Sequence, residues 1–79
     1  MSKLEKVIAK VMSGRSDANI GFADLCALLL KLGFIERVGS GSHHTFARGE
    51  SFVNLQPDGS KAKAYQVRQV REHLRKLGH

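Results

Sequence analysis

Two adjacent histidines, His43 and His44, follow a run of glycine and serine in the stretch "GSGSHHTF", residues 39–46. An imidazole ordinarily titrates near pH 6.5, so it can accept or donate a proton at neutral pH. Glycines such as Gly41 let the backbone approach a ligand closely, and backbone N–H groups with the Ser42 hydroxyl can hold phosphate oxygens. The stretch therefore suggests acid–base chemistry at a phosphate. The plain alternative is a glycine–serine hairpin with surface histidines.

The two histidines differ if the residues after the glycine run form a strand. Side chains alternate between the two faces of a strand. Phe46 is the residue of this stretch that most favours the core, and His44 has the same parity as Phe46. We therefore expect His44 on the packed side and His43 on the solvent side, where a phosphate can approach.

A basic stripe is predicted near the end of the chain. Arg68, Arg71 and Arg75 recur at spacings of three and four, so they share one face of a helix. Lys61 and Lys63 add positive charge where this stretch begins. Such a ridge can hold RNA phosphates. The alternative is a charged face that contacts only water and is partly neutralised by neighbouring acidic residues.

Other kinds of chemical site have little support in the sequence. The four histidines come with neither a cysteine pair nor an HExxH spacing, so we expect no metal site. The sequence has no P-loop and no dinucleotide-binding loop, and we expect no small-molecule cofactor. Cys26, the single cysteine, falls on an apolar helical face and is interpreted as a core residue rather than a nucleophile.

The composition indicates one small basic domain. The chain has 79 residues, with 13 Lys and Arg against 7 Asp and Glu and a formal net charge of +6. A chain of this length leaves little room for a deep substrate cavity, so we expect any active site to be a shallow surface. The charge favours a polyanion such as nucleic acid as a partner, although solubility alone would also account for it. The single cysteine and the lack of a signal-peptide pattern or a long apolar segment favour a cytoplasmic protein with no membrane partner.

The hydrophobic pattern predicts the elements that position these residues. They are three helices and three strands, in the order helix, helix, strand, strand, strand, helix. The expected ranges are 3–12, 22–32, 34–38, 43–48, 52–56 and 64–77. Short links between the strands predict an antiparallel meander, with helices on one face and the other face open to water. The second helix is apolar enough to need covering on two sides, by the sheet and by the first helix.

The third predicted strand carries an aromatic residue, Phe52, whose face of the sheet follows from its neighbours. Phe52 has the opposite parity to Val53 and Leu55, so it lies on the face open to water if these two are in the core. An exposed Phe52 could stack a nucleic-acid base. The alternative is that Phe52 packs against the first helix or a partner protein.

Three motifs, taken in their order along the chain, resemble the HicA family of bacterial toxin–antitoxin pairs. They are "LGF" at residues 32–34, "IERVGSGSHHTF" at residues 35–46 and "KAYQVRQVREHL" at residues 63–74. The resemblance covers most of the chain from about Asp17 onward. It implies a single HicA-like domain over residues 1–79, in which the helix from Lys3 is an addition to the minimal pattern.

The resemblance implies an α+β fold like that of the double-stranded RNA-binding domain, with helices on one face of a three-stranded antiparallel sheet. It implies a toxin that cleaves mRNA, a HicB-type antitoxin that blocks it, and a catalytic histidine directly after "GS", which is His43. We expect a metal-independent endoribonuclease in which His43 is the general acid/base. The expected RNA- and phosphate-binding residues are Gly41, Ser42, Lys61, Lys63, Arg68, Arg71 and Arg75. The alternatives are a non-catalytic module that binds double-stranded RNA by shape, or an interaction protein.

Overall fold

The order of elements follows the predicted one, with small additions between them. A computed structural model describes residues 2–38 and 43–78. The elements are α1 (Lys3–Ser13), the 3-10 helix η1 (Asp17–Asn19), α2 (Phe22–Lys31), β1 (Ile35–Val38), β2 (His44–Arg48), β3 (Ser51–Leu55), β4 (Pro57–Asp58), β5 (Lys61–Ala62) and α3 (Ala64–Lys76). η1 and the β4–β5 pair are not predicted, because elements of two or three residues are too short to carry a hydrophobic period. None of the described helices has the length and apolar character needed to cross a membrane.

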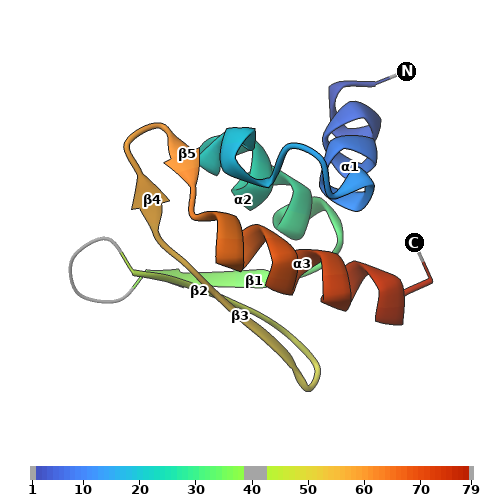
Figure 1. The fold of residues 1–79 in the computed structure, drawn as a ribbon. Helices are drawn as coiled ribbons and strands as arrows, with labels where there is room; N and C mark the ends of the chain where they lie inside the picture. Colours follow the sequence, from blue (N-terminus) through green and yellow to red (C-terminus); the bar gives the residue numbers. More distant parts are fainter. Residues whose placement is uncertain (1, 39–42, 79) are drawn as a thin grey trace.

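The main sheet is an antiparallel meander in the order β1-β2-β3. Its covered face carries the buried Phe46, Val53 and Leu55 and lies under the helices (Figure 1). The register places the other set of side chains together on the opposite face, which we call the open face: Ile35, Arg37, Thr45, Ala47, Phe52 and Asn54. The predicted α+β class, with an antiparallel three-stranded sheet and helices on one face, is confirmed.

The second helix, α2, is covered on two sides, as predicted. Leu25, Leu28 and Leu29 are fully buried in the core. The buried valines of α1 pack against α2 and α3, and Figure 1 shows α1 as the helix farthest from the sheet. Leu30 lies on the same apolar helix but is exposed. The reason is helical geometry, because each residue turns about 100° from the one before it.

The β4–β5 hairpin reverses the chain between the sheet and α3. Pro57 pairs with Ala62. Gly59, in the turn, has φ +63°, in the left-handed region that favours glycine. The reversal brings Lys63, which precedes α3, opposite Gln56, which follows β3. The hairpin therefore joins two residues on which the candidate site depends.

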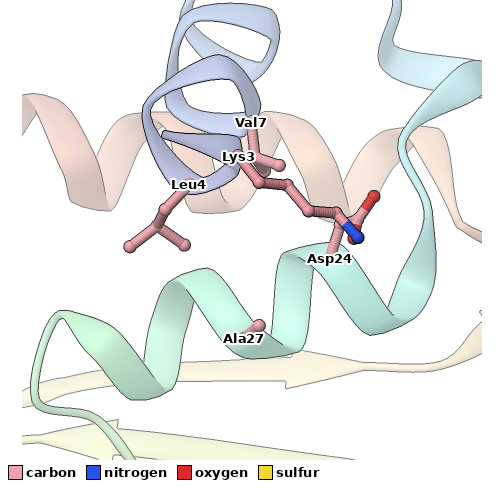
Figure 2. A pocket seen from close by; sticks show the side chains of 5 residues that line it. All are labelled: Lys3, Leu4, Val7, Asp24 and Ala27. Atoms are coloured by element: carbon pink, nitrogen blue, oxygen red, sulfur yellow. The ribbon is translucent and has the colours of Figure 1, made fainter. Parts of the chain in front are cut away.

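A small hollow lies between α1 and α2 (Figure 2), lined by Lys3, Leu4, Val7, Asp24 and Ala27. Its volume is about 200 Å³, whereas small-molecule sites usually measure about 300–1,000 Å³. Figure 2 shows the Lys3 side chain extending from α1 to Asp24, where Nζ lies 3.3 Å from Oδ1. The hollow is on the helical side of the molecule, so it is separate from the open face of the sheet.

Candidate functional site

His43 and His44 lie on opposite sides of the sheet. The His44 ring packs edge-on against Phe22 of α2, with ring centroids 5.1 Å apart. Its Nδ1–H donates to the Glu36 carboxylate at 2.6 Å, and the two side chains are only 23% and 27% exposed. His43, the residue before β2, is exposed. The predicted difference is confirmed: His44 belongs to the packed side and His43 to the solvent side.

A chain of hydrogen bonds holds the His43 ring. Lys63 Nζ donates to Gln56 Oε1 at 3.0 Å. An ammonium group can only donate, so the amide nitrogen of Gln56 is the atom that faces His43. This nitrogen lies 2.9 Å from Nε2 of His43. An amide N–H can only donate, so the arrangement fits the tautomer in which Nε2 of His43 carries the lone pair and accepts this hydrogen bond.

Gln56 is in turn fixed by α3. The backbone N–H of Gln56 donates to Gln66 Oε1 at 2.7 Å, and Gln66 is only 3% exposed. Gln66 Nε2 donates to the Tyr65 hydroxyl at 3.3 Å. The buried amide satisfies a backbone group just beyond the end of β3, where the main sheet no longer supplies a partner. Neither glutamine is predicted from the sequence as part of the site. The feature of the sequence that could have identified Gln66 is that this polar residue lies among the apolar positions of the last helix.

Arg71 does not belong to a phosphate-binding ridge, which corrects its expected role. Its guanidinium binds both carboxylate oxygens of Asp17, at 2.8 and 3.1 Å, and the Val11 carbonyl at 3.0 Å. The Arg71 and Asp17 side chains are only 12% and 13% exposed. These hydrogen bonds from Arg71 lower the pKa of Asp17. Arg71 therefore joins α3 to η1 and the end of α1, and we remove it from the RNA-binding set.

Arg68 and Arg75 share the flank of α3 on which Arg71 lies. Both are exposed, and Arg75 pairs with Glu72 on the same helix. Arg68 lies close enough to Asp17 to contribute to the lowering of its pKa, so this flank faces η1. Gln66, on the other flank of α3, is the residue that reaches Gln56. Arg68 and Arg75 therefore do not converge with His43 on one site.

The remaining expected site residues fall into three places. Gly41 and Ser42 lie outside the described residues. Lys61 is exposed in β5 and pairs across the hairpin with Asp58. Of the expected residues that the structure describes, only Lys63 is brought together with His43, through Gln56. Within residues 2–38 and 43–78, no group of three or more His, Cys, Asp or Glu side chains is placed to hold a metal ion.

The open face next to His43 carries three polar residues that were not predicted as part of a site. Arg37, Thr45 and Asn54 pair across the three strands, and Thr45 Oγ1 donates to Asn54 Oδ1 at 2.9 Å. Arg37 is exposed. The strand register makes it a diagonal neighbour of His43, and such positions are about 7–8 Å apart in a sheet. The Arg37 guanidinium can therefore reach a phosphate held at His43. Strand parity could have identified Arg37 from the sequence, because it places Arg37 on the same face as Ile35.

Cys26 is held in a form that does not favour nucleophilic chemistry. It is half-buried in α2, and burial together with the nearby charge of Glu36 raises the pKa of its thiol to about 11. Because the thiolate is the reactive form, we expect iodoacetamide to alkylate Cys26 at least about tenfold more slowly in the folded protein than in urea. Mass spectrometry of timed samples at one mildly alkaline pH measures both rates. Equal rates would contradict the interpretation of Cys26 as a core residue.

Comparison with known proteins gives no further assignment. The chain matches no protein-family model, and it shows no significant similarity to a curated protein or to a solved structure. The resemblance to the HicA family therefore rests on the three sequence motifs quoted above.

Proposed function

We propose that the protein is a metal-independent endoribonuclease that cleaves mRNA, with His43 as its acid–base residue. The observation that carries the proposal is the solvent-facing imidazole of His43, whose Nε2 lies 2.9 Å from the amide nitrogen of Gln56, which Lys63 orients. The HicA resemblance supports it, since His43 is the histidine that follows "GS". The net charge of +6 supports a polyanionic substrate. The double-stranded RNA-binding-domain-like classification and a cytoplasmic location are parts of the same proposal.

His43 acts as the base in the proposed reaction. Its Nε2 accepts a hydrogen bond from Gln56, and a ribose 2′-OH can take the place of that donor. Nε2 removes the proton of the 2′-OH while the 2′ oxygen bonds to the adjacent phosphorus and the bond to the 5′ oxygen breaks. The products are a 2′,3′-cyclic phosphate and a 5′-OH, whose proton comes from solvent. His43 then releases its own proton to solvent before the next turnover.

The cations near His43 have a separate role from the proton transfer. One positioned acid–base group contributes about 10² to 10⁴ in rate. Fixed positive charges add to this by stabilising the charge that develops on the phosphate oxygens. Arg37 is placed to do so directly. Lys63 acts on His43 through Gln56, because its Nζ donates to the amide oxygen of that residue.

The expected protein partner of such a toxin is a HicB-type antitoxin. Acidic or polar groups of the antitoxin would cover His43 and block access of RNA to the open face. Attraction between these groups and the basic chain would speed formation of the complex.

Cleavage of RNA is expected to persist in excess EDTA, because a histidine rather than a metal-bound hydroxide removes the proton. The purified protein is incubated with end-labelled RNA, and the fragments are examined for 2′,3′-cyclic phosphate ends. RNA of the same sequence with 2′-O-methyl groups is the control and should resist, because its 2′ oxygen has no proton to lose. Cleavage that requires a divalent ion, or that occurs equally on the 2′-O-methyl RNA, would exclude the mechanism. Binding without cleavage would instead favour a non-catalytic RNA-binding module.

A further inference from the structure

A row of apolar side chains crosses the open face of the sheet. Ile35 pairs with Ala47, and Ala47 pairs with Phe52, so the three lie in line across the strands. Ile35 is 68% exposed and Phe52 is 56% exposed. Single apolar residues are common on protein surfaces, but large apolar side chains aligned on one face mark a contact surface.

This apolar row is the last of three successive rows on the same face. The first contains His43 and its partner Gln56. The second contains Arg37, Thr45 and Asn54. Residues two apart on a strand are separated by about 6.7 Å, so the apolar row is about 13 Å from His43 along the strands. The face therefore offers a proton acceptor, then polar groups with one cation, and then an aromatic ring.

The charges of the open face favour an anionic ligand over other occupants. None of its described strand residues is acidic, since Glu36 points to the covered face and bonds His44. Nucleic acid alternates charged phosphates with flat, weakly polar bases, which is the alternation that Arg37 and Phe52 would meet. In a duplex the base faces are stacked on one another and are not free to contact an aromatic side chain. Unpaired bases stack readily on aromatic side chains.

We propose that the substrate is single-stranded RNA, which lies across the open face from His43 to Phe52 with an unpaired base stacked on the Phe52 ring. This inference rests on the proposed function, because it assigns the substrate of the same site. Arg37 binds a backbone phosphate between the two ends. Thr45 and Asn54, whose side chains already bond one another, line the path between them.

A tryptophan placed at position 52 tests the stacking directly. The chain contains no tryptophan, so Phe52→Trp introduces a single indole. The probe is a short 2′-O-methyl oligonucleotide, offered as a single strand and as a blunt duplex. We expect the single strand to quench the fluorescence and the duplex to leave it unchanged at the same concentration. Leu30→Trp is the matched control, because Leu30 is also exposed but lies on α2, and its signal should not respond.

Removing the Phe52 ring and removing the Arg37 charge should change two different properties of single-strand binding, its affinity and its dependence on salt. Phe52→Ala is expected to raise Kd between about 5-fold and 150-fold, the range for loss of one stacked base. Arg37→Gln is expected to reduce the slope of log K against log salt by about 0.7, the value for one phosphate contact on a single strand. Arg15→Gln, an exposed arginine in the loop after α1, should change neither quantity. Circular dichroism melts establish that each variant is folded.

Three results would overturn the proposal. They are quenching of both tryptophan variants alike, duplex binding as tight as binding of the single strand, and a Phe52→Trp signal that responds to a partner protein but not to the oligonucleotide. The last result would make Phe52 a protein contact. Because the 2′-O-methyl probe cannot be cleaved, these measurements do not depend on catalysis. Stacking of the probe on a protein that fails to cleave ordinary RNA would reject the proposed function alone.

Discussion

His43→Ala should lower the rate of RNA cleavage by at least about 10²-fold, because no other group then takes the proton of the 2′-OH. The fold should be nearly unaffected. The imidazole is exposed, and its partner Gln56 keeps its own bonds to Lys63 and Gln66. Cleavage of one RNA substrate and a circular dichroism melt of the same preparation measure the two effects. Binding of the 2′-O-methyl oligonucleotide should persist.

His44→Ala is the matched control and should show the opposite pattern. It removes the hydrogen bond to Glu36 and the contact with Phe22, both on the packed side of the sheet. We expect the free energy of unfolding to fall by about 1–2 kcal/mol, with cleavage retained by the folded protein. Full cleavage by a folded His43→Ala protein would remove His43 from the mechanism. Loss of cleavage confined to a stably folded His44→Ala protein would assign the acid–base role to His44.

The difference between the two histidines could be predicted because a strand leaves few choices. Phe46 must be buried, and the two-residue period of the strand then fixes the side of every neighbour. The same rule explains why Phe52 is exposed, since Val53 and Leu55 occupy the core. The alternative that Phe52 packs against the first helix is wrong, because α1 lies on the other side of the molecule (Figure 1). Local periodicity is therefore sufficient to predict the face that each side chain occupies, wherever one residue of the strand must be buried.

The contacts that could not be predicted join residues far apart in the chain. Arg71 and Asp17 are separated by 54 positions. In the sequence, Arg71 has the same helical spacing as Arg68 and Arg75. Only the packing of η1 against α3 distinguishes it from them. The hydrogen bonds that hold His43 also depend on how the chain folds back. Gln56 lies 13 positions after His43, and Gln56 meets Lys63 only because the β4–β5 hairpin reverses the chain.

Arg71→Ala is expected to lower the free energy of unfolding by about 3 kcal/mol at neutral pH. The substitution leaves the largely buried Asp17 carboxylate without its partner and the Val11 carbonyl without a donor. Arg68→Ala is the matched control on the same flank of α3, and its exposed side chain should contribute no more than about 0.5 kcal/mol. Urea denaturation of the three proteins measures these differences. Equal effects of the two substitutions would show that Arg71 has no special structural role.

Acid should reduce the difference in the free energy of unfolding between the wild type and Arg71→Ala. The hydrogen bonds from Arg71 lower the pKa of Asp17 from its ordinary value of 3.8. The ion pair therefore contributes fully above that value, and its contribution is lost as the pH falls through the lower pKa of the folded protein. Below about pH 4 the wild type should lose stability more steeply than the variant, until the hydrogen bond to Val11, which does not titrate, accounts for the remaining difference. A difference that stays constant throughout this range would show that ionised Asp17 is not stabilised by Arg71.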